Sequence, residues 1–154
     1  DINIELLKIA NKSGIITIYD PGPPNKYNNY DHFKFVDFLT PNKHEAEYLL
    51  GKKIDGIELE AAKELKEIGA KHVIITLGSE GLVYSGDFDK IFKPIQVNSI
   101  DPVGSGDCFN GALASMINKG ENIINSITFA QKAASLSTTR KGASQSFPYL
   151  NEIK

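Results

Sequence analysis

The sequence predicts an α/β fold with a mainly parallel sheet, on three observations. Apolar, β-rich segments alternate with segments of helical periodicity, which is the order of βαβ units. The segment 72–77 is apolar almost without interruption, as in strands that are covered on both faces. Polar turns follow the strands at 20–24, 40–45, 76–81 and 101–107. Ligands bind at this edge of such sheets, so we expect the four turns to converge there.

The first elements are a helix and a strand. Apolar residues at helical spacing predict a helix over 3–12, which Gly14 ends. The β-rich run 15–19 predicts a strand, because the proline-rich turn 20–24 stops it abruptly. A polar loop follows over 25–32.

The next elements are a second strand and two helices. The aromatic run 35–39 predicts a short strand, and Thr40-Pro41-Asn42 opens a helix that runs through Leu50. The sequence Asp55-Gly56-Ile57-Glu58 predicts a capping box for a third helix, which ends at Ile68. Strand 72–77 comes next.

The second half of the chain continues with strands and then helices. After the turn 78–81, β-rich residues predict strands at 82–85 and 91–97. Apolar periodicity predicts helices at about 106–118 and 122–138, and residues 141–148 read as a loop.

Composition limits the classes of function. The chain has 154 residues, enough for one domain with its own core, and 23% of them are charged. A net charge of −2 without a basic block gives no reason to expect nucleic acid or an anionic membrane as a partner. The single cysteine, Cys108, rules out an internal disulfide and favours a cytoplasmic location.

The turn Gly104-Ser105-Gly106-Asp107 carries the most chemistry. Small residues at a helix start let backbone N–H groups converge on an anion. An acid at that position would repel phosphate, unless it takes a proton from an attacking hydroxyl. The combination therefore suggests phosphoryl transfer to an alcohol. No GxxxxGK[ST] loop occurs, which argues against P-loop chemistry.

Four segments, in order, resemble those of the ribokinase-like (PfkB) carbohydrate kinases: 40–47, 76–81, 101–112 and 139–148. The last is most similar to the monovalent-cation loop of the ribokinases. The resemblance implies the three-layer, Rossmann-like ribokinase fold over 1–154. It covers only the C-terminal half of such a kinase, so we expect this chain to be a piece of a longer protein. The N-terminal half, the lid and most sugar contacts would then be absent. Where ribokinases usually have Asn before the early proline-rich loop, this chain has Asp20.

The resemblance implies roles at the 101–112 segment. Asp107 would be the catalytic base and sugar contact, and the backbone of Gly104, Ser105 and Gly106 would form the anion hole. The alternative is that Asp107 only caps a helix.

The other segments would bind cofactors. Asn42 and Glu45 would organise Mg²⁺ largely through water, although the same pair also fits a capping box. One set would contact ATP: Thr76, Gly78, Ser79, Gly81 and, at adenine, Gln131. For the residues of 76–81 the alternative is an ordinary turn between two strands, and for Gln131 it is tight packing of its helix. Another set would surround K⁺, or else form a loop held by hydrogen bonds: Asp101, Val103, Ser137, Arg140, Gly142 and Ser146.

These roles imply ATP-dependent phosphorylation of a sugar primary hydroxyl, D-ribose to ribose 5-phosphate, with ATP, Mg²⁺ and K⁺ as cofactors. Two alternatives remain open. One is another PfkB kinase acting on fructose, 2-keto-3-deoxygluconate or a nucleoside; the other is a non-catalytic nucleotide-binding fragment. We expect the isolated piece to be inactive, and we consider a homodimer for the full-length protein.

Overall fold

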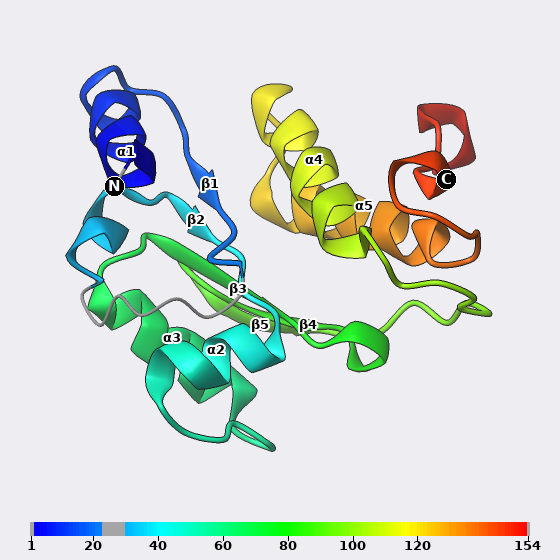
Figure 1. The fold of residues 1–154 in the computed structure, drawn as a ribbon, viewed down its shortest axis with the longest axis horizontal. Coiled ribbons are helices and arrows are strands. Elements are labelled where there is room, and N and C mark those ends of the chain that lie inside the picture. The colour runs from blue at the N-terminus through cyan, green and yellow to red at the C-terminus, as the bar shows by residue number, and fades with distance from the viewer. Residues whose placement is uncertain (1, 23–29, 154) are drawn as a thin grey trace. The chain divides into compact units, whose positions relative to one another are not determined.

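The computed structural model describes residues 2–22 and 30–153, which form two compact units, Asp1–Phe92 and Lys93–Lys154 (Figure 1). The first unit holds a sheet and three α-helices, and the second holds two longer α-helices. The α/β class predicted from the sequence is confirmed. Within the described ranges, every helix is too short or too polar to cross a bilayer.

The sheet of the first unit has five strands in the order β1-β2-β3-β4-β5. Their bounds are β1 Ile18–Tyr19, β2 Phe38–Leu39, β3 His72–Thr76, β4 Leu82–Ser85 and β5 Asp89–Phe92. The pairs β1–β2 and β2–β3 are parallel, whereas β3–β4 and β4–β5 are antiparallel. The sheet is therefore mixed rather than mainly parallel. Short turns join β3, β4 and β5, and such turns permit only antiparallel neighbours.

Three helices share one apolar core with the sheet. They are α1 (Ile2–Lys12), α2 (Lys43–Leu50) and α3 (Glu58–Ile68), and α2 and α3 lie side by side in Figure 1. Leu7 of α1, Leu65 of α3 and Val73 of β3 belong to the same buried cluster. In β3, Val73, Ile74 and Ile75 are all fully buried, as the apolar run predicts.

Three predicted elements differ in detail from the structure. The capping box at Asp55–Glu58 is wrong: the N-cap of α3 is Ile57, with no side-chain hydrogen bond. Asp55 instead accepts a 2.6 Å hydrogen bond from Lys43. The predicted strand 91–97 is the earlier β5, Asp89–Phe92, because Lys90 and Asp89 pair with Tyr84 and Ser85 across a tight turn.

The first two strands are also shorter than predicted. Residues 15–17 precede β1, and Asp31–Phe35 form a 3-10 helix, η1, before β2. The polar loop predicted at 25–32 lies largely outside the described residues.

The second unit is a helix pair with a loop folded against it. Helices α4 (Ser105–Asn118) and α5 (Ile123–Ser137) pack together and bury Phe109, Leu113 and Ile127. Asn122 caps α5 by accepting a 2.9 Å hydrogen bond from the Asn125 amide. The segment that follows α5 ends in two 3-10 turns, η3 (Ser144–Ser146) and η4 (Leu150–Glu152).

Candidate functional site

Asn42 and Glu45 form a reciprocal capping box at the start of α2, directly after β2. Asn42 Oδ1 accepts a 3.0 Å hydrogen bond from the Glu45 amide, and Glu45 Oε2 accepts a 2.8 Å bond from the Asn42 amide. The capping box that the sequence offered as the alternative to a Mg²⁺ role is therefore present. It does not exclude a cation role, because each carboxylate or amide oxygen has a second acceptor position.

The nucleotide-loop candidate Thr76 lies beside Asn42. The two residues form a parallel bridge, and the Thr76 amide donates a 3.0 Å hydrogen bond to the Pro41 carbonyl. The ends of β2 and β3 are thus tied together, as the convergence argument predicts for these two turns. Asn42, Glu45 and Thr76 are the sequence-predicted residues that the first unit brings together.

The Glu45 carboxyl sits in an environment that disfavours its charge. Partial burial raises its pKa, and the nearby Asp20 carboxylate adds to the rise, while the hydrogen bond from Asn42 opposes it. Asp20 follows β1 and Glu45 follows β2, so the ends of these two strands place negative charge together. A cation at this edge would relieve that repulsion.

The segment Gly78–Gly81 forms the tight turn between β3 and β4. The Leu77 amide donates a 2.9 Å hydrogen bond to the Gly81 carbonyl, and residues Gly78–Glu80 form a 3-10 turn, η2. Gly78 has φ +59° and Gly81 has φ +98°, which favour glycine at both positions. The turn predicted here is confirmed, and a contact of Gly78, Ser79 or Gly81 with a nucleotide stays a prediction.

In the second unit, Gly104 starts α4 in the left-handed region with φ +79°. A Cβ there would lie 3.1 Å from Cα of Ala143, a tight contact, and the positive φ disfavours other residues, so glycine suits the turn against the 143–147 segment. The Ser105 amide bonds the Pro102 carbonyl at 3.1 Å, and the first intrahelical bond runs from Cys108 to Gly104 at 2.9 Å. The amides of Gly106 and Asp107 therefore precede the helical ladder and can serve an anion.

Asp107 occupies the first turn of α4 and is exposed. The N-cap residue Gly104 has no side chain to cap the helix. Asp107 is the acidic residue of the first turn, where its negative charge lies at the positive end of the helix dipole. Its neighbour Cys108 is buried, and burial raises the pKa of the thiol, which keeps it protonated. An accessible carboxylate and two unengaged helix amides are thus adjacent.

The loop after α5 is tied to the segment before α4 by Asp101. Its Oδ2 accepts a 2.9 Å hydrogen bond from the Gly142 amide, and its Oδ1 accepts a 3.1 Å bond from the Val103 amide. These two bonds lower the pKa of Asp101. Buried Ser146 donates to the Ala143 carbonyl at 2.7 Å. The hydrogen-bonded loop that was the alternative to a K⁺ site is present.

Three further predicted residues make local contacts. The guanidinium of Arg140 pairs with the Glu152 carboxylate, which raises the pKa of Arg140. Buried Ser137 donates to the Ala134 carbonyl at 2.8 Å. Gln131 Nε2 donates to the Lys93 carbonyl at 2.9 Å, within the same unit. Because the Arg140 side chain is a cation paired with Glu152, the group that Arg140 can offer to a metal ion is its backbone carbonyl.

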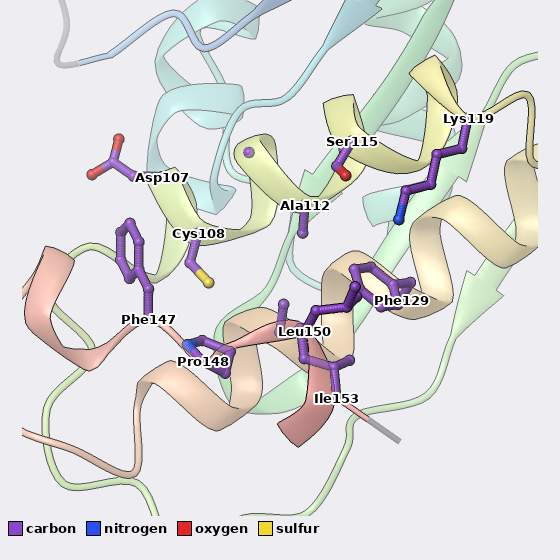
Figure 2. Close-up of a pocket in the computed structure, with 12 residues that line it drawn as sticks. Asp107, Cys108, Ala112, Ser115, Lys119, Phe129, Phe147, Pro148, Leu150 and Ile153 are labelled. Carbon is purple, nitrogen blue, oxygen red and sulfur yellow. The ribbon is translucent and has the colours of Figure 1, made fainter.

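The second unit contains a pocket of about 290 Å³. Figure 2 shows the residues that line it. Asp107 lies at one end of the pocket and Lys119 at the other, with Ser115 and mostly apolar groups between them. Its lining comes from α4, α5 and the C-terminal segment: Asp107, Cys108, Gly111, Ala112, Ser115, Lys119, Phe129, Ala133, Phe147, Pro148, Leu150 and Ile153. Gln131 does not line it.

Sequence reasoning missed most of this lining, although one signal was available. Asp107, Gly111, Ser115 and Lys119 are spaced by four, so they form one row along α4. Small residues in such a row leave a groove on the helix surface. Across the described ranges, His, Cys, Asp and Glu side chains form no group of three or more that could hold a metal ion by themselves.

Comparisons with known proteins agree with the predicted family. The family model described as pfkB family carbohydrate kinase matches residues 1–150. The ribokinase of Staphylococcus aureus (strain COL) is 34% identical over 154 residues, which cover 97% of this chain and 50% of the relative. The ribokinase of Lactococcus lactis (strain IL1403) is 32% identical over 155 residues, which cover 100% of this chain and 49% of the relative.

Solved structures give the same result. A ribokinase from Thermotoga maritima matches with a TM-score of 0.85 and 34% identity, covering 96% of this chain and 50% of that chain. Arabidopsis thaliana ribokinase, solved with ribose and ATP, matches with a TM-score of 0.86 and 28% identity. The match covers 99% of this chain and 50% of that chain. The ribokinase fold predicted from the sequence is confirmed. The chain spans about half the length of the relatives it matches and corresponds to their C-terminal half.

Proposed function

The chain belongs to the pfkB family of carbohydrate kinases, and on that premise we propose that it is the catalytic half of an ATP-dependent sugar kinase. The proposed reaction is transfer of the γ-phosphoryl group of ATP to a primary hydroxyl of D-ribose, giving ribose 5-phosphate. Similarity to several ribokinases supports ribose as the sugar.

The start of α4 is the observation that carries the proposal. The amides of Gly106 and Asp107 precede the helical ladder, next to an exposed carboxylate on the same turn. Backbone donors at a helix N-terminus stabilise the negative charge that develops on a transferring phosphoryl group. Their geometry is held by Gly104, whose close approach to Ala143 locks the turn.

Asp107 acts as the base in this scheme. Its carboxylate takes the proton from the sugar hydroxyl as the hydroxyl oxygen attacks the γ-phosphorus. The bond from phosphorus to the bridging oxygen breaks, and ADP leaves with that electron pair. An exposed carboxylate is reachable by a substrate hydroxyl, which a buried helix cap would not be.

Asn42 and Glu45 fit an indirect Mg²⁺ site. Their oxygens are engaged once each in the capping box, so water can bridge their remaining acceptor positions to an ion. Mg²⁺ supplies charge neutralisation at the phosphates when bound. The rigid box keeps both side chains at the end of β2, beside Thr76, where the Gly78–Gly81 turn offers backbone for ATP.

The loop of Asp101 fits K⁺ through oxygen chemistry. Asp101 and Ser146 would contribute side-chain oxygens to the ion, and the backbone carbonyls would come from Val103, Ser137, Arg140 and Gly142. Oxygen donors from a hydrogen-bonded loop suit a hard monovalent cation. Since Asp101 ties this loop to the residues just before α4, an ion there would stiffen the turn that carries Asp107.

The test is a phosphorylation assay of the full-length gene product against ribose, deoxyribose, fructose, 2-keto-3-deoxygluconate and nucleosides. Turnover with ribose is expected, and Asp107→Asn should lower kcat by about 10²–10⁴-fold while leaving ATP affinity unchanged. Glu121→Gln, an exposed change on the same unit, is the control and should leave kcat unchanged.

Other results would redirect the proposal. Turnover with another substrate but not ribose would assign the protein to a different kinase of the family. Calorimetry that detects ATP binding to this 154-residue chain, with no transfer by the full-length product, would favour a nucleotide-binding module. Full activity of Asp107→Asn would remove Asp107 as the base.

A further inference from the structure

Arg140 and Glu152 form an ion pair with two hydrogen bonds, in the segment that follows α5. Arg140 Nη1 donates a 3.3 Å hydrogen bond to Glu152 Oε2, and Arg140 Nη2 donates a second bond to Glu152 Oε1. Two parallel bonds fix the orientation of a guanidinium relative to a carboxylate, which a single contact does not. The two side chains are only 40% and 33% exposed, so the pair lies against the loop rather than out in solvent.

The Glu152 carboxylate is also held by the backbone of η4. Its Oε2 accepts a 2.7 Å hydrogen bond from the Tyr149 amide, and the Glu152 amide donates a 2.9 Å bond to the Tyr149 carbonyl. These reciprocal bonds orient the carboxylate from its own turn. Glu152 therefore loses less side-chain freedom on pairing with Arg140 than an unrestrained surface glutamate would.

The pair joins the two ends of a loop, which we call the 140–152 loop. Inside this loop, the Gly142 amide donates its 2.9 Å hydrogen bond to Asp101. Ala143 packs against the turn at Gly104, where an added Cβ would lie 3.1 Å from the Ala143 Cα. Closing a loop at its ends reduces the number of conformations that its interior can take. The ion pair therefore stabilises the contacts by which this loop supports the start of α4.

The ion pair between Lys52 and Glu64 gives a contrast. A lysine ammonium is a point charge on a flexible stem, so it does not fix the orientation of its partner as the guanidinium fork does. Exposed pairs of this kind typically contribute little. Glu64 lies on α3 in the first unit, and it is the matched control: the same residue type, in an ion pair outside the 140–152 loop.

We propose that Glu152 is a positioning residue of the active site: acting through Arg140, it closes the 140–152 loop and supports the turn at the start of α4. Glu152 itself would touch neither substrate nor ion. Arg140 and Gly142 are two of the residues whose carbonyls would face K⁺, so a looser loop should bind the ion more weakly. The consequence for catalysis rests on the proposed function, whereas closure of the loop does not.

Hydrogen exchange of the Gly142 amide measures closure of the loop, in the full-length product of the gene and without K⁺. In Glu152→Gln this amide should exchange at least about threefold faster, because the loop opens more often once the carboxylate charge and its second acceptor oxygen are lost. The Ile74 amide, in the middle of β3, should be unchanged and so reports an intact fold. Glu64→Gln should leave both amides at their wild-type rates.

Activation by K⁺ gives the catalytic readout. Glu152→Gln should raise the K⁺ concentration for half-maximal activity at least about twofold, because the ion binds the closed loop and its apparent affinity falls with the closed fraction. Saturating K⁺ draws the loop closed again, so the change in the K⁺ requirement should exceed any change in kcat at saturating K⁺. Glu64→Gln should change neither quantity.

A double-mutant cycle tests whether Glu152 acts through Arg140. Arg140→Gln should speed exchange of the Gly142 amide as Glu152→Gln does, and the double variant should exchange no faster than the faster single variant. The reason is that either substitution already removes the pair. Effects that multiply in the double variant would show that Glu152 acts without Arg140, through the Tyr149 amide, and the proposal would fail.

The remaining outcomes separate this inference from the proposed function. Unchanged exchange of the Gly142 amide in Glu152→Gln would overturn the inference, whatever the activity. Faster exchange with an unchanged K⁺ requirement, in an active K⁺-dependent kinase, would overturn the link to the active site. A full-length product without kinase activity, or with activity that ignores K⁺, would count against the proposed function instead, and the exchange rates would still decide whether Glu152 closes the loop.

Discussion

The Gly142 amide donates a 2.9 Å hydrogen bond to Oδ2 of Asp101 across 41 positions of sequence. The other oxygen of the same carboxylate accepts a hydrogen bond from the amide of Val103, two residues before α4 begins at Ser105. One side chain therefore sets the position of the loop after α5 relative to the turn that carries Asp107.

Asp101→Asn should loosen this connection and lower stability in a pH-dependent way. The two backbone hydrogen bonds lower the pKa of Asp101 from its usual 3.8. The stabilisation is thus fully present above about pH 3.8 and is lost as pH falls through the lower, folded-state pKa. Thermal unfolding from pH 7 to pH 2 should show a difference between wild type and variant that shrinks at the acid end.

Glu67→Gln, on the exposed side of α3, is the control for that experiment, and its difference from wild type should not follow the same curve. A constant offset for Asp101→Asn at every pH would show that the ionised carboxylate does not hold the loop. In the full-length kinase, Asp101→Asn should also raise the K⁺ concentration needed for half-maximal activity.

Gly104→Ala and Gly106→Ala form a matched pair in one turn. Gly104→Ala should cost about 1–2 kcal/mol, because alanine disfavours φ +79° and its Cβ would crowd Ala143. Gly106 is helical with open space around it, so Gly106→Ala should leave stability unchanged or raise it by up to about 1 kcal/mol. Urea unfolding of the two variants measures the difference.

The same pair separates folding from catalysis. If the Gly106 amide serves the transferring phosphate at close range, Gly106→Ala should reduce kcat of the full-length kinase without reducing its stability. Equal unfolding midpoints for the two alanine variants would contradict the packing of Gly104 against Ala143.

Two substitutions at Asn42 distinguish the cap from a cation role. Asn42→Ala removes the capping oxygen and should destabilise the protein by about 1 kcal/mol. Asn42→Ser keeps an acceptor for the Glu45 amide and should be close to wild type in a chemical denaturation experiment. If Asn42 also organises Mg²⁺, both variants should weaken the Mg²⁺ dependence of activity; if only Asn42→Ala does, the residue acts through the helix.

His72 should make stability depend on pH near neutrality. Its Nδ1 lies 2.9 Å from the Tyr84 hydroxyl, and its ring stacks on Phe38 at 4.5 Å. Burial, the largest cause, lowers the pKa of His72 below 6.5, aided by Lys66 and Lys71 and opposed by Asp87 and Asp37. The unfolded chain therefore binds the proton first, so stability is complete above about pH 6.5 and declines as pH falls through the folded-state pKa.

Denaturation between pH 8 and pH 5 measures this effect. His72→Gln should flatten the pH dependence, whereas His44→Gln, at an exposed position of α2, should retain it. Tyr84→Phe should cost about 1 kcal/mol at pH 8 through the lost hydroxyl contacts. An NMR titration giving His72 a pKa above 6.5 would contradict the assignment.

Several features of this protein follow from local sequence. The helix ends at Gly51 and Gly69, the turn at Gly78–Gly81 and the buried strand His72–Thr76 are read correctly because each depends on neighbours within a few residues. The family follows from motif order alone. The Asn42–Glu45 box, one of two readings left open by the sequence, depends on a spacing of three and is confirmed.

Other features depend on residues that are distant in sequence. The direction of β4 and β5 is set by pairing across tight turns. The sheet is therefore mixed, where the sequence predicted a mainly parallel one. Asp55 accepts a hydrogen bond from Lys43, twelve residues away, rather than capping α3, because the connection between α2 and α3 folds back on α2. The pocket along Gly111, Ser115 and Lys119 also needs a wall from α5 and the C-terminal segment, to which Phe129 and Phe147 contribute.

The sequence by itself determined most element types and the family, since these rest on local spacing and motif order, and it singled out Asp107 as the candidate base. Only the tertiary structure decided which acceptor the polar groups distant in sequence use: Asp101 for Gly142, Asp55 for Lys43 and the Lys93 carbonyl for Gln131. It also decided that Leu6 and Ile9 are exposed while Leu7 is buried. The physical reason is that a hydrogen bond or a buried contact requires two groups to meet, and the chain path that brings them together is a property of the whole fold.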